Sequence, residues 1–109
     1  MAKTNSDQLH GTLDMLVLKV LDTGPQHGYG ITARLEQLSS DVLGIEEGSL
    51  YPALYRMEQR GWISSAWAVT ENNRRARFNR LTRAGRRQFE AETASWARLT
   101  AAVQGVLGS

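Results

Sequence analysis

Arginine is the residue whose number and spacing in this chain point most directly to a chemistry. Seven arginines fall within residues 74–87, and the longer stretch 49–87 holds nine basic residues against two acidic ones, a net charge of +7. The rest of the chain has four basic and nine acidic residues, a net charge of −5. Because a guanidinium group is planar and always charged, it suits contacts with phosphate. The asymmetry predicts a local site for a polyanion.

Other residues that commonly do chemistry are sparse. The chain has no cysteine, which excludes a disulfide scaffold, a thiol nucleophile and a zinc site of the finger type. Its two histidines, His10 and His27, have no ligand set around them in the sequence. We find neither paired carboxylates nor a nucleophile motif. We therefore expect no enzyme, no metal and no cofactor.

Length and composition set the scale of the molecule. The 109 residues suffice for one domain, and 41% hydrophobic with 22% charged residues is ordinary for a globular protein. The first residues lack the apolar core of a signal peptide, and the apolar stretch near residues 13–21 is too short to cross a membrane. A soluble, cytoplasmic protein is expected.

Apolar periodicity predicts two helices before residue 40. The first begins near Thr12, its expected N-cap, after a loose segment over residues 1–8, and it ends before Gly24-Pro25. A glycine-rich turn at 26–30, with His27 hydrogen-bonded inside it, leads into the second helix.

A third helix is predicted to open at residues 47–49, after a very short strand at Ile45. Ser49 is its expected N-cap, Pro52 falls in its first turn and Gly61 ends it. Leu54 belongs to its inward stripe. Glu58 is expected to pair with an arginine within the fold.

The second half of the chain predicts a β-hairpin followed by one long helix. Strands over 62–70 and 76–81 flank a turn, and Arg74 and Arg75 lie at its tip. Thr82 caps a helix that runs to about Leu107, roughly 37 Å at 1.5 Å per residue. So small a body cannot cover a helix of that length.

The overhanging helix carries an apolar stripe that predicts a dimer. Its spacing is close to a heptad repeat, and the first helix shows a second apolar face, so both are candidates for the interface. The predicted interface residues are Met15, Leu18, Phe89, Trp96, Leu99, Val103 and Val106. Trp96 has two interpretations: it packs in the dimer seam, or two copies sandwich a small aromatic effector.

The order helix, helix, helix, hairpin, long helix indicates a mainly α protein with a small β-hairpin, a winged helix-turn-helix. We assign residues 1–82 to the winged-helix DNA-binding domain and 83–109 to a C-terminal dimerisation helix. The third helix would enter the major groove, and the wing arginines would bind phosphate or a narrow minor groove. The residues of the third helix left facing outward or to the side are Ser49, Tyr51, Pro52, Tyr55, Arg56 and Gln59. All of them except Gln59 are predicted DNA-binding residues.

Four motifs in order resemble the PadR family of transcriptional regulators over residues 9–107. They are Leu13-Asp14-Met15-Leu16-Val17-Leu18, the run from Gly24 to Ile31, Gly48-Ser49-Leu50-Tyr51-Pro52-Ala53-Leu54 with Met57-Glu58 and Gly61-Trp62-Ile63, and Arg74-Arg75 leading to Leu81-Thr82 and Gly85. A single C-terminal helix is similar to the compact branch of the family.

This resemblance implies a homodimeric repressor that binds an inverted-repeat operator in double-stranded DNA. Carried over position by position, it implies DNA contacts from Ser49, Tyr51, Pro52 and Tyr55 on the recognition helix and from Arg74, Arg75 and Arg77 in the wing. The chain departs from the family at Asn79, where an aromatic residue is usual, and this is expected to weaken a packing or phosphate contact. The alternative function is a winged-helix protein-interaction module that does not bind DNA.

Overall fold

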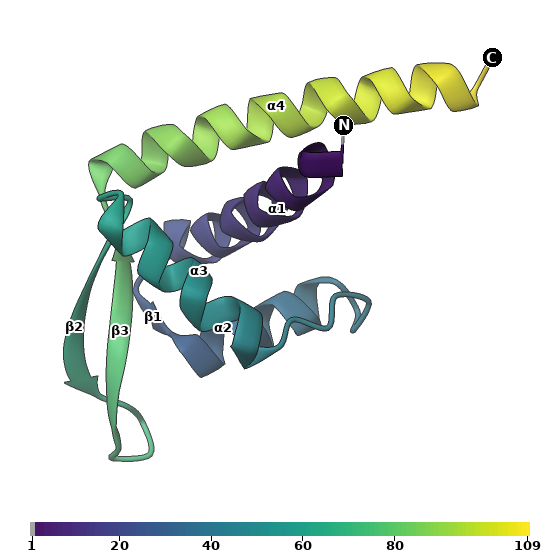
Figure 1. Cartoon of the computed structure of the whole chain (residues 1–109). Helices are drawn as coiled ribbons and strands as arrows, with labels where there is room; N and C mark the ends of the chain where they lie inside the picture. The colour runs from purple at the N-terminus through teal and green to yellow at the C-terminus, as the bar shows by residue number, and fades with distance from the viewer. Residues whose placement is uncertain (1) are drawn as a thin grey trace.

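The computed structural model describes residues 2–109, with side chains from Gly11 onward. Its elements in chain order are α1 (Ala2–Asp22), β1 (Gln26–His27), α2 (Gly28–Leu38), α3 (Glu47–Gln59), β2 (Ile63–Val69), β3 (Arg75–Leu81) and α4 (Arg83–Leu107). Helices α1, α2 and α3 pack together beside the small sheet, and α4 runs across α1 (Figure 1). The predicted mainly α winged helix-turn-helix is confirmed.

The core gathers around α1. Val17 and Leu18 are fully buried, and they pack with Ile31 of α2 and with Leu50 and Met57 of α3, which are also fully buried. Helix α1 begins at Ala2, so the prediction of a start at Thr12 was wrong. The polar residues before Thr12 continue the helix rather than cap it, and the side chain of His10 lies outside the described ones.

A two-residue strand precedes α2, where the sequence predicted only a turn. His27 pairs with Phe78 of β3, and the two rings meet edge to face with centroids 5.2 Å apart. The His27 Nδ1 accepts the Gly30 N–H at 3.0 Å, which caps α2. The expected hydrogen bond of His27 within this turn is therefore present.

Helix α3 begins at Glu47, within the predicted opening, but its N-cap lies three residues before the predicted Ser49. The backbone N–H groups of Ser49 and Leu50 both donate to the carbonyl of Glu46 at 3.0 Å, so Glu46 is the N-cap residue. Ser49 therefore lies in the first turn, and Pro52 falls one turn further in than expected. Ile45 belongs to no strand; it packs against the core from the preceding loop.

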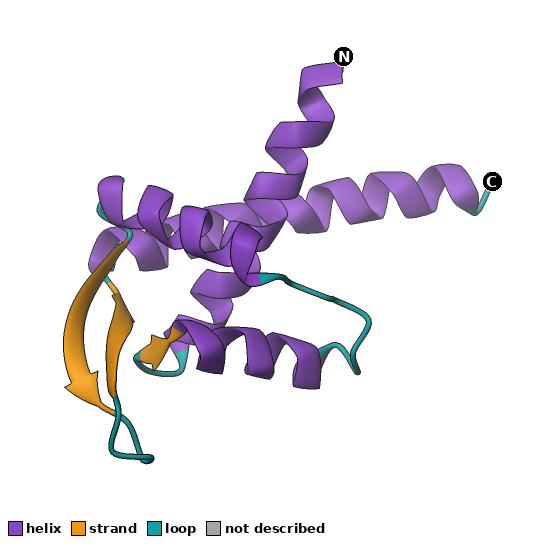
Figure 2. Ribbon diagram, turned by 60° about the horizontal axis from the view of Figure 1, so that its bottom comes forward, coloured by secondary structure: helices purple, strands orange, loops and turns teal. Residues whose placement is uncertain are grey.

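The sheet has the order β1-β3-β2, with every neighbouring pair antiparallel. Asn79 is buried on β3, and its Nδ2 donates to the backbone carbonyl of Gln26 at 3.3 Å. Asn79 thus helps to hold the extra strand, a role that the sequence did not indicate. Figure 2 shows the β2–β3 hairpin extending away from the helices.

Helix α4 begins directly after the wing, since only Thr82 separates it from β3. The Thr82 Oγ1 accepts the Gly85 N–H at 3.0 Å, which confirms the predicted cap. Arg86 then forms an ion pair with Asp22 of α1 at 2.6 Å. The C-terminal half of α4 runs past the other helices (Figure 1), and the molecule measures 55 × 29 × 26 Å.

Candidate DNA-binding surface

The outer face of α3 presents two large aromatic side chains to solvent. Tyr51 is 51% exposed and Tyr55 is 65% exposed, whereas Leu50, Leu54 and Met57 are buried on the opposite face. Ser49 and Pro52 are exposed beside the two tyrosines. This division follows from the helical period, which sends residues 50, 54 and 57 to one side.

Gly28, the first residue of α2, lies against Tyr51. A β-carbon on Gly28 would lie 2.9 Å from both the phenolic oxygen and a ring carbon of Tyr51. The start of helix α2 therefore packs against the phenol ring of Tyr51. The absence of a side chain at Gly28 is what allows Tyr51 to approach α2 this closely.

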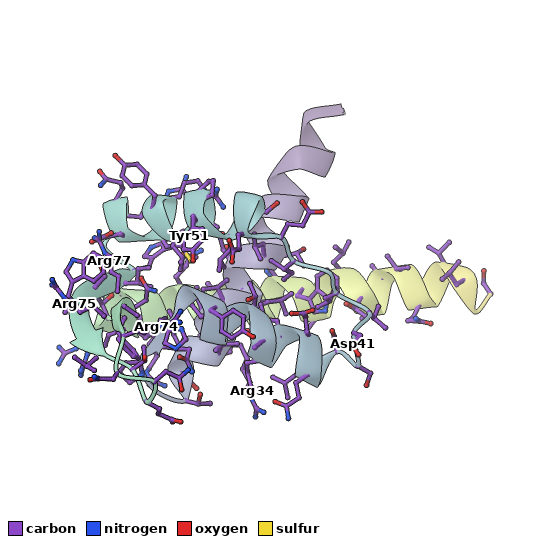
Figure 3. All side chains as sticks on the ribbon, turned by 90° about the horizontal axis from the view of Figure 1, so that it is seen from below. Arg34, Asp41, Tyr51, Arg74, Arg75 and Arg77 are labelled. Atoms are coloured by element: carbon purple, nitrogen blue, oxygen red, sulfur yellow. The ribbon has the colours of Figure 1, made fainter. Side chains whose placement is uncertain are left out.

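The tip of the wing carries Arg74 and Arg75, and both are exposed. The turn before them is closed by a hydrogen bond from the Thr70 N–H to the Arg74 carbonyl at 2.7 Å, and Asn73 adopts a φ of 59°. Asparagine tolerates this left-handed conformation. In the view from below, Tyr51 and the labelled wing arginines lie at the same end of the molecule (Figure 3).

Trp67 is a candidate site residue that the sequence reasoning missed. It is 60% exposed on β2, and the guanidinium carbon of Arg75 lies 5.2 Å from the centroid of its ring. Its cross-strand partner is Arg77. The alternation of side chains along the strand could have indicated Trp67. A residue directly opposite an arginine lies on the same face of the hairpin as that arginine.

Arg77 is held by groups of the protein itself. Its Nη2 donates to both carboxylate oxygens of Glu58 at 3.0 Å, and its Nε donates to the Ser65 Oγ at 2.8 Å. The predicted internal pairing of Glu58 is confirmed. A small hollow of about 150 Å³ lies next to this pair, lined by Gly28, Tyr51, Leu54, Tyr55, Glu58, Arg77 and Asn79.

Arg56 points into the fold rather than along the outer face of α3. Its Nη2 lies 2.8 Å from Asp14 Oδ1 on α1, and only 27% of its side chain is exposed. Burial raises the pKa of Asp14 above its ordinary value, and the attraction of Arg56 offsets this only in part. Arg56 thus turns to the side of α3 and contacts α1, so this predicted DNA-binding residue is held in the α1–α3 contact.

The apolar stripe of α4 is exposed, as expected for an interface. Trp96, Leu99 and Val103 are 46%, 40% and 44% exposed, and Val106 is 75% exposed. Phe89 instead packs in part against the core of its own chain.

Two residues predicted for the dimer interface are buried within the fold of the chain itself. Leu18 is fully buried and Met15 is 9% exposed, because α1 is surrounded by elements of its own chain. The prediction that they face a second subunit was therefore wrong.

Two other features, a metal site and a membrane-spanning helix, are absent from the described residues. No group of three or more His, Cys, Asp or Glu side chains there is placed to hold a metal ion. Within the same part of the chain, no helix is long and apolar enough to cross a membrane.

Comparison with known proteins agrees with this geometry. Residues 17–91 match the family model described as the transcriptional regulator PadR-like family. The chain belongs to this family. The PadR-like chain is thus related to DNA-binding regulators of transcription, not to enzymes.

Solved structures of similar proteins extend the match over nearly the whole PadR-like chain. A transcriptional regulator from Clostridium thermocellum superposes with a TM-score of 0.82 at 25% identity, over 91% of this chain and 96% of that one. A PadR family transcriptional regulator from Eggerthella lenta is 30% identical, with a TM-score of 0.73 and coverage of 97% and 91%.

A match of higher identity comes from a longer protein. Over 89 residues the chain is 45% identical to an uncharacterised 37.1 kDa protein in transposon TN4556 of Streptomyces fradiae. The match covers 82% of this chain but only 24% of that protein.

Proposed function

We propose that this PadR-like protein is a homodimeric repressor that binds an inverted-repeat operator. The observation that carries the proposal is the placement of exposed tyrosines on α3 and exposed arginines on the wing at one end of the molecule (Figure 3). Helix α3 would enter the major groove, and the wing would contact the flanking backbone or minor groove. The proposed DNA contacts are Ser49, Tyr51, Pro52, Tyr55, Arg74 and Arg75.

The proposed dimer forms through α4, residues 83–109 acting as the dimerisation helix of the winged domain. The exposed stripe of Trp96, Leu99, Val103 and Val106 supports this. An exposed apolar face of that length on one helix is typical of a surface that is buried against a second helix. Two such protomers would place their recognition helices about one helical turn of DNA apart. Trp96 would either fill the seam or stack on a flat aromatic molecule held between protomers.

The test is selection of a duplex from a random-sequence pool by the purified protein. Binding to the selected duplex and to a scrambled duplex of equal length is then measured across a salt series. The proposal expects an inverted repeat among the selected sequences and tighter binding to it at every salt concentration. Equal, weak binding to both duplexes would contradict a sequence-specific regulator. Absence of binding at low salt would favour a protein-interaction module.

A further inference from the structure

The wing is attached to the body at its base and, on the side of β3, through the pairing of Asn79 and Phe78 with β1. Ile63 and Leu81 are cross-strand partners at the base, where Ile63 is buried and Leu81 packs against the core. The seven residues of β2, counted from Ile63, lead outward over roughly 23 Å at about 3.3 Å per residue. A small rotation at the base would therefore displace the arginines at the tip by a large distance.

A ring of three side chains ties the hairpin to α3 beyond this base. Ser65 Oγ donates to Glu58 Oε2 at 3.0 Å and accepts from Arg77 Nε at 2.8 Å, while Arg77 Nη2 donates to both Glu58 oxygens at 3.0 Å. The three residues come from β2, α3 and β3. We name this ring the wing clamp. Every hydrogen bond in it links the recognition helix to the wing or one wing strand to the other.

The charge of Glu58 makes the clamp unusual for a surface that binds a polyanion. Residues 49–87 contain only two acidic side chains, Glu58 and Glu71. A carboxylate beside the proposed DNA contacts repels phosphate, so by charge alone its removal would strengthen binding. The pair also contributes little to overall stability, because its side chains are 33% and 54% exposed.

We propose that Glu58 and Arg77 are positioning residues that fix the angle between α3 and the wing. They would make the tyrosines of α3 and the tip arginines fit one duplex at the same time. The inference rests on the proposed function and changes the role of Arg77, which binds Glu58 rather than phosphate. The planar guanidinium matters here, because Arg77 reaches Glu58 with Nη2 and Ser65 with Nε, two nitrogens at a fixed spacing. A lysine has a single nitrogen and cannot reproduce both contacts.

The experiment compares Glu58→Gln, Arg77→Lys and the double variant with the wild type on the selected and scrambled duplexes. Glu71→Gln is the matched control, because it removes the same charge from the exposed wing turn. We expect Glu58→Gln and Arg77→Lys each to weaken binding to the selected duplex by at least about fivefold, and the double variant to be no weaker than either. Glu71→Gln is expected to bind at least as tightly as wild type.

A second measurement follows the clamp without DNA. Hydrogen–deuterium exchange of the free protein is expected to accelerate at the β2 and β3 amides in Glu58→Gln and Arg77→Lys, and to stay unchanged in Glu71→Gln. Wild-type protein that selects no duplex would overturn the proposed function, and the inference with it. If the wild type selects one and Glu58→Gln binds it equally or more tightly, the inference alone fails.

Discussion

Gly85 packs directly against the backbone carbonyl of Trp62, the residue that leads into β2. A β-carbon built on Gly85 would overlap the Trp62 oxygen. That same oxygen accepts the Thr82 N–H at 3.0 Å, so the start of the wing and the start of α4 share one tight junction. Any side chain at position 85 forces the two elements apart.

Gly85→Ala is therefore expected to destabilise the protein by about 2 kcal/mol or more, because the obstacle is backbone and cannot rotate away. Gly105→Ala in the same helix is the control, since nothing lies within 4 Å of its β-carbon position. That control should stabilise the protein by about 0.5–1 kcal/mol. Urea unfolding at fixed protomer concentration measures both, and equal free energies of unfolding would contradict the close junction.

Gly28→Ala is expected to weaken DNA binding without unfolding the protein. The added methyl group would push aside the Tyr51 phenol, a half-exposed side chain end that is free to move. If Tyr51 contacts bases, affinity for the selected duplex should fall on the order of tenfold. Gly44→Ala, which meets nothing within 4 Å, should bind as wild type does. Fluorescence anisotropy gives both affinities, and wild-type binding by Gly28→Ala would remove Tyr51 from the contact set.

Replacing both Arg74 and Arg75 by alanine should lower the salt dependence of binding. Removing one phosphate-binding charge reduces the slope of log K against log salt by about 0.9, so the pair should change it by up to about 2. Lys19→Ala on α1 removes one charge outside the wing and should leave the slope unchanged. A wild-type slope in the double variant would show that the wing tip does not contact phosphate.

Asp14 predicts a pH dependence of stability with a definite sign. Its pKa is raised in the folded state, chiefly by burial, so the folded state binds the proton more tightly than the unfolded one. This contribution to stability is fully present at acid pH and is lost as pH rises through the folded-state pKa. The wild-type free energy of unfolding minus that of Asp14→Asn should therefore decrease from acid to neutral pH. Urea titrations at several pH values test this, and an increase would mean that the Arg56 ion pair outweighs burial.

Val103→Glu should disrupt the proposed dimer. A carboxylate in the middle of the exposed stripe would have to be buried without a partner, which should weaken self-association by at least about tenfold. Ala101→Glu adds the same charge on the opposite face of α4 and should leave the dimer intact. Sedimentation analysis distinguishes the two variants. A wild-type sedimentation profile for Val103→Glu would place the interface elsewhere.

The helices from α2 onward and the wing could be predicted from local patterns in the sequence. The three-to-four residue period around Leu50, Leu54 and Met57 set the buried face of α3, and Thr82 capped α4 as its position predicted. Strand β1 could not be predicted, because two residues show no alternation and their pairing with β3 is made across the fold.

The pairings of individual arginines were also beyond local rules. Arg56 and Asp14 are 42 positions apart, and only the packing of α1 on α3 brings them together. On a helical wheel Arg56 lies toward the side, where the same residue can turn to solvent or to a neighbouring helix. Leu18 was misplaced for a related reason: an apolar second face on α1 met other parts of its own chain rather than another protomer.

Since Thr82 alone joins β3 to α4, the helical turns between Gly85 and Trp96 set the direction of the apolar stripe relative to the base of the wing. Each residue of an α-helix advances the axis by about 1.5 Å and turns it by about 100°. One alanine inserted between Gly85 and Trp96 would swing the stripe by that angle relative to the wing, whereas seven would nearly restore its direction about 10 Å further away. The length of this segment therefore sets the direction of the apolar stripe as well as its distance from the wing. In a dimer it would also set the direction in which the second wing points.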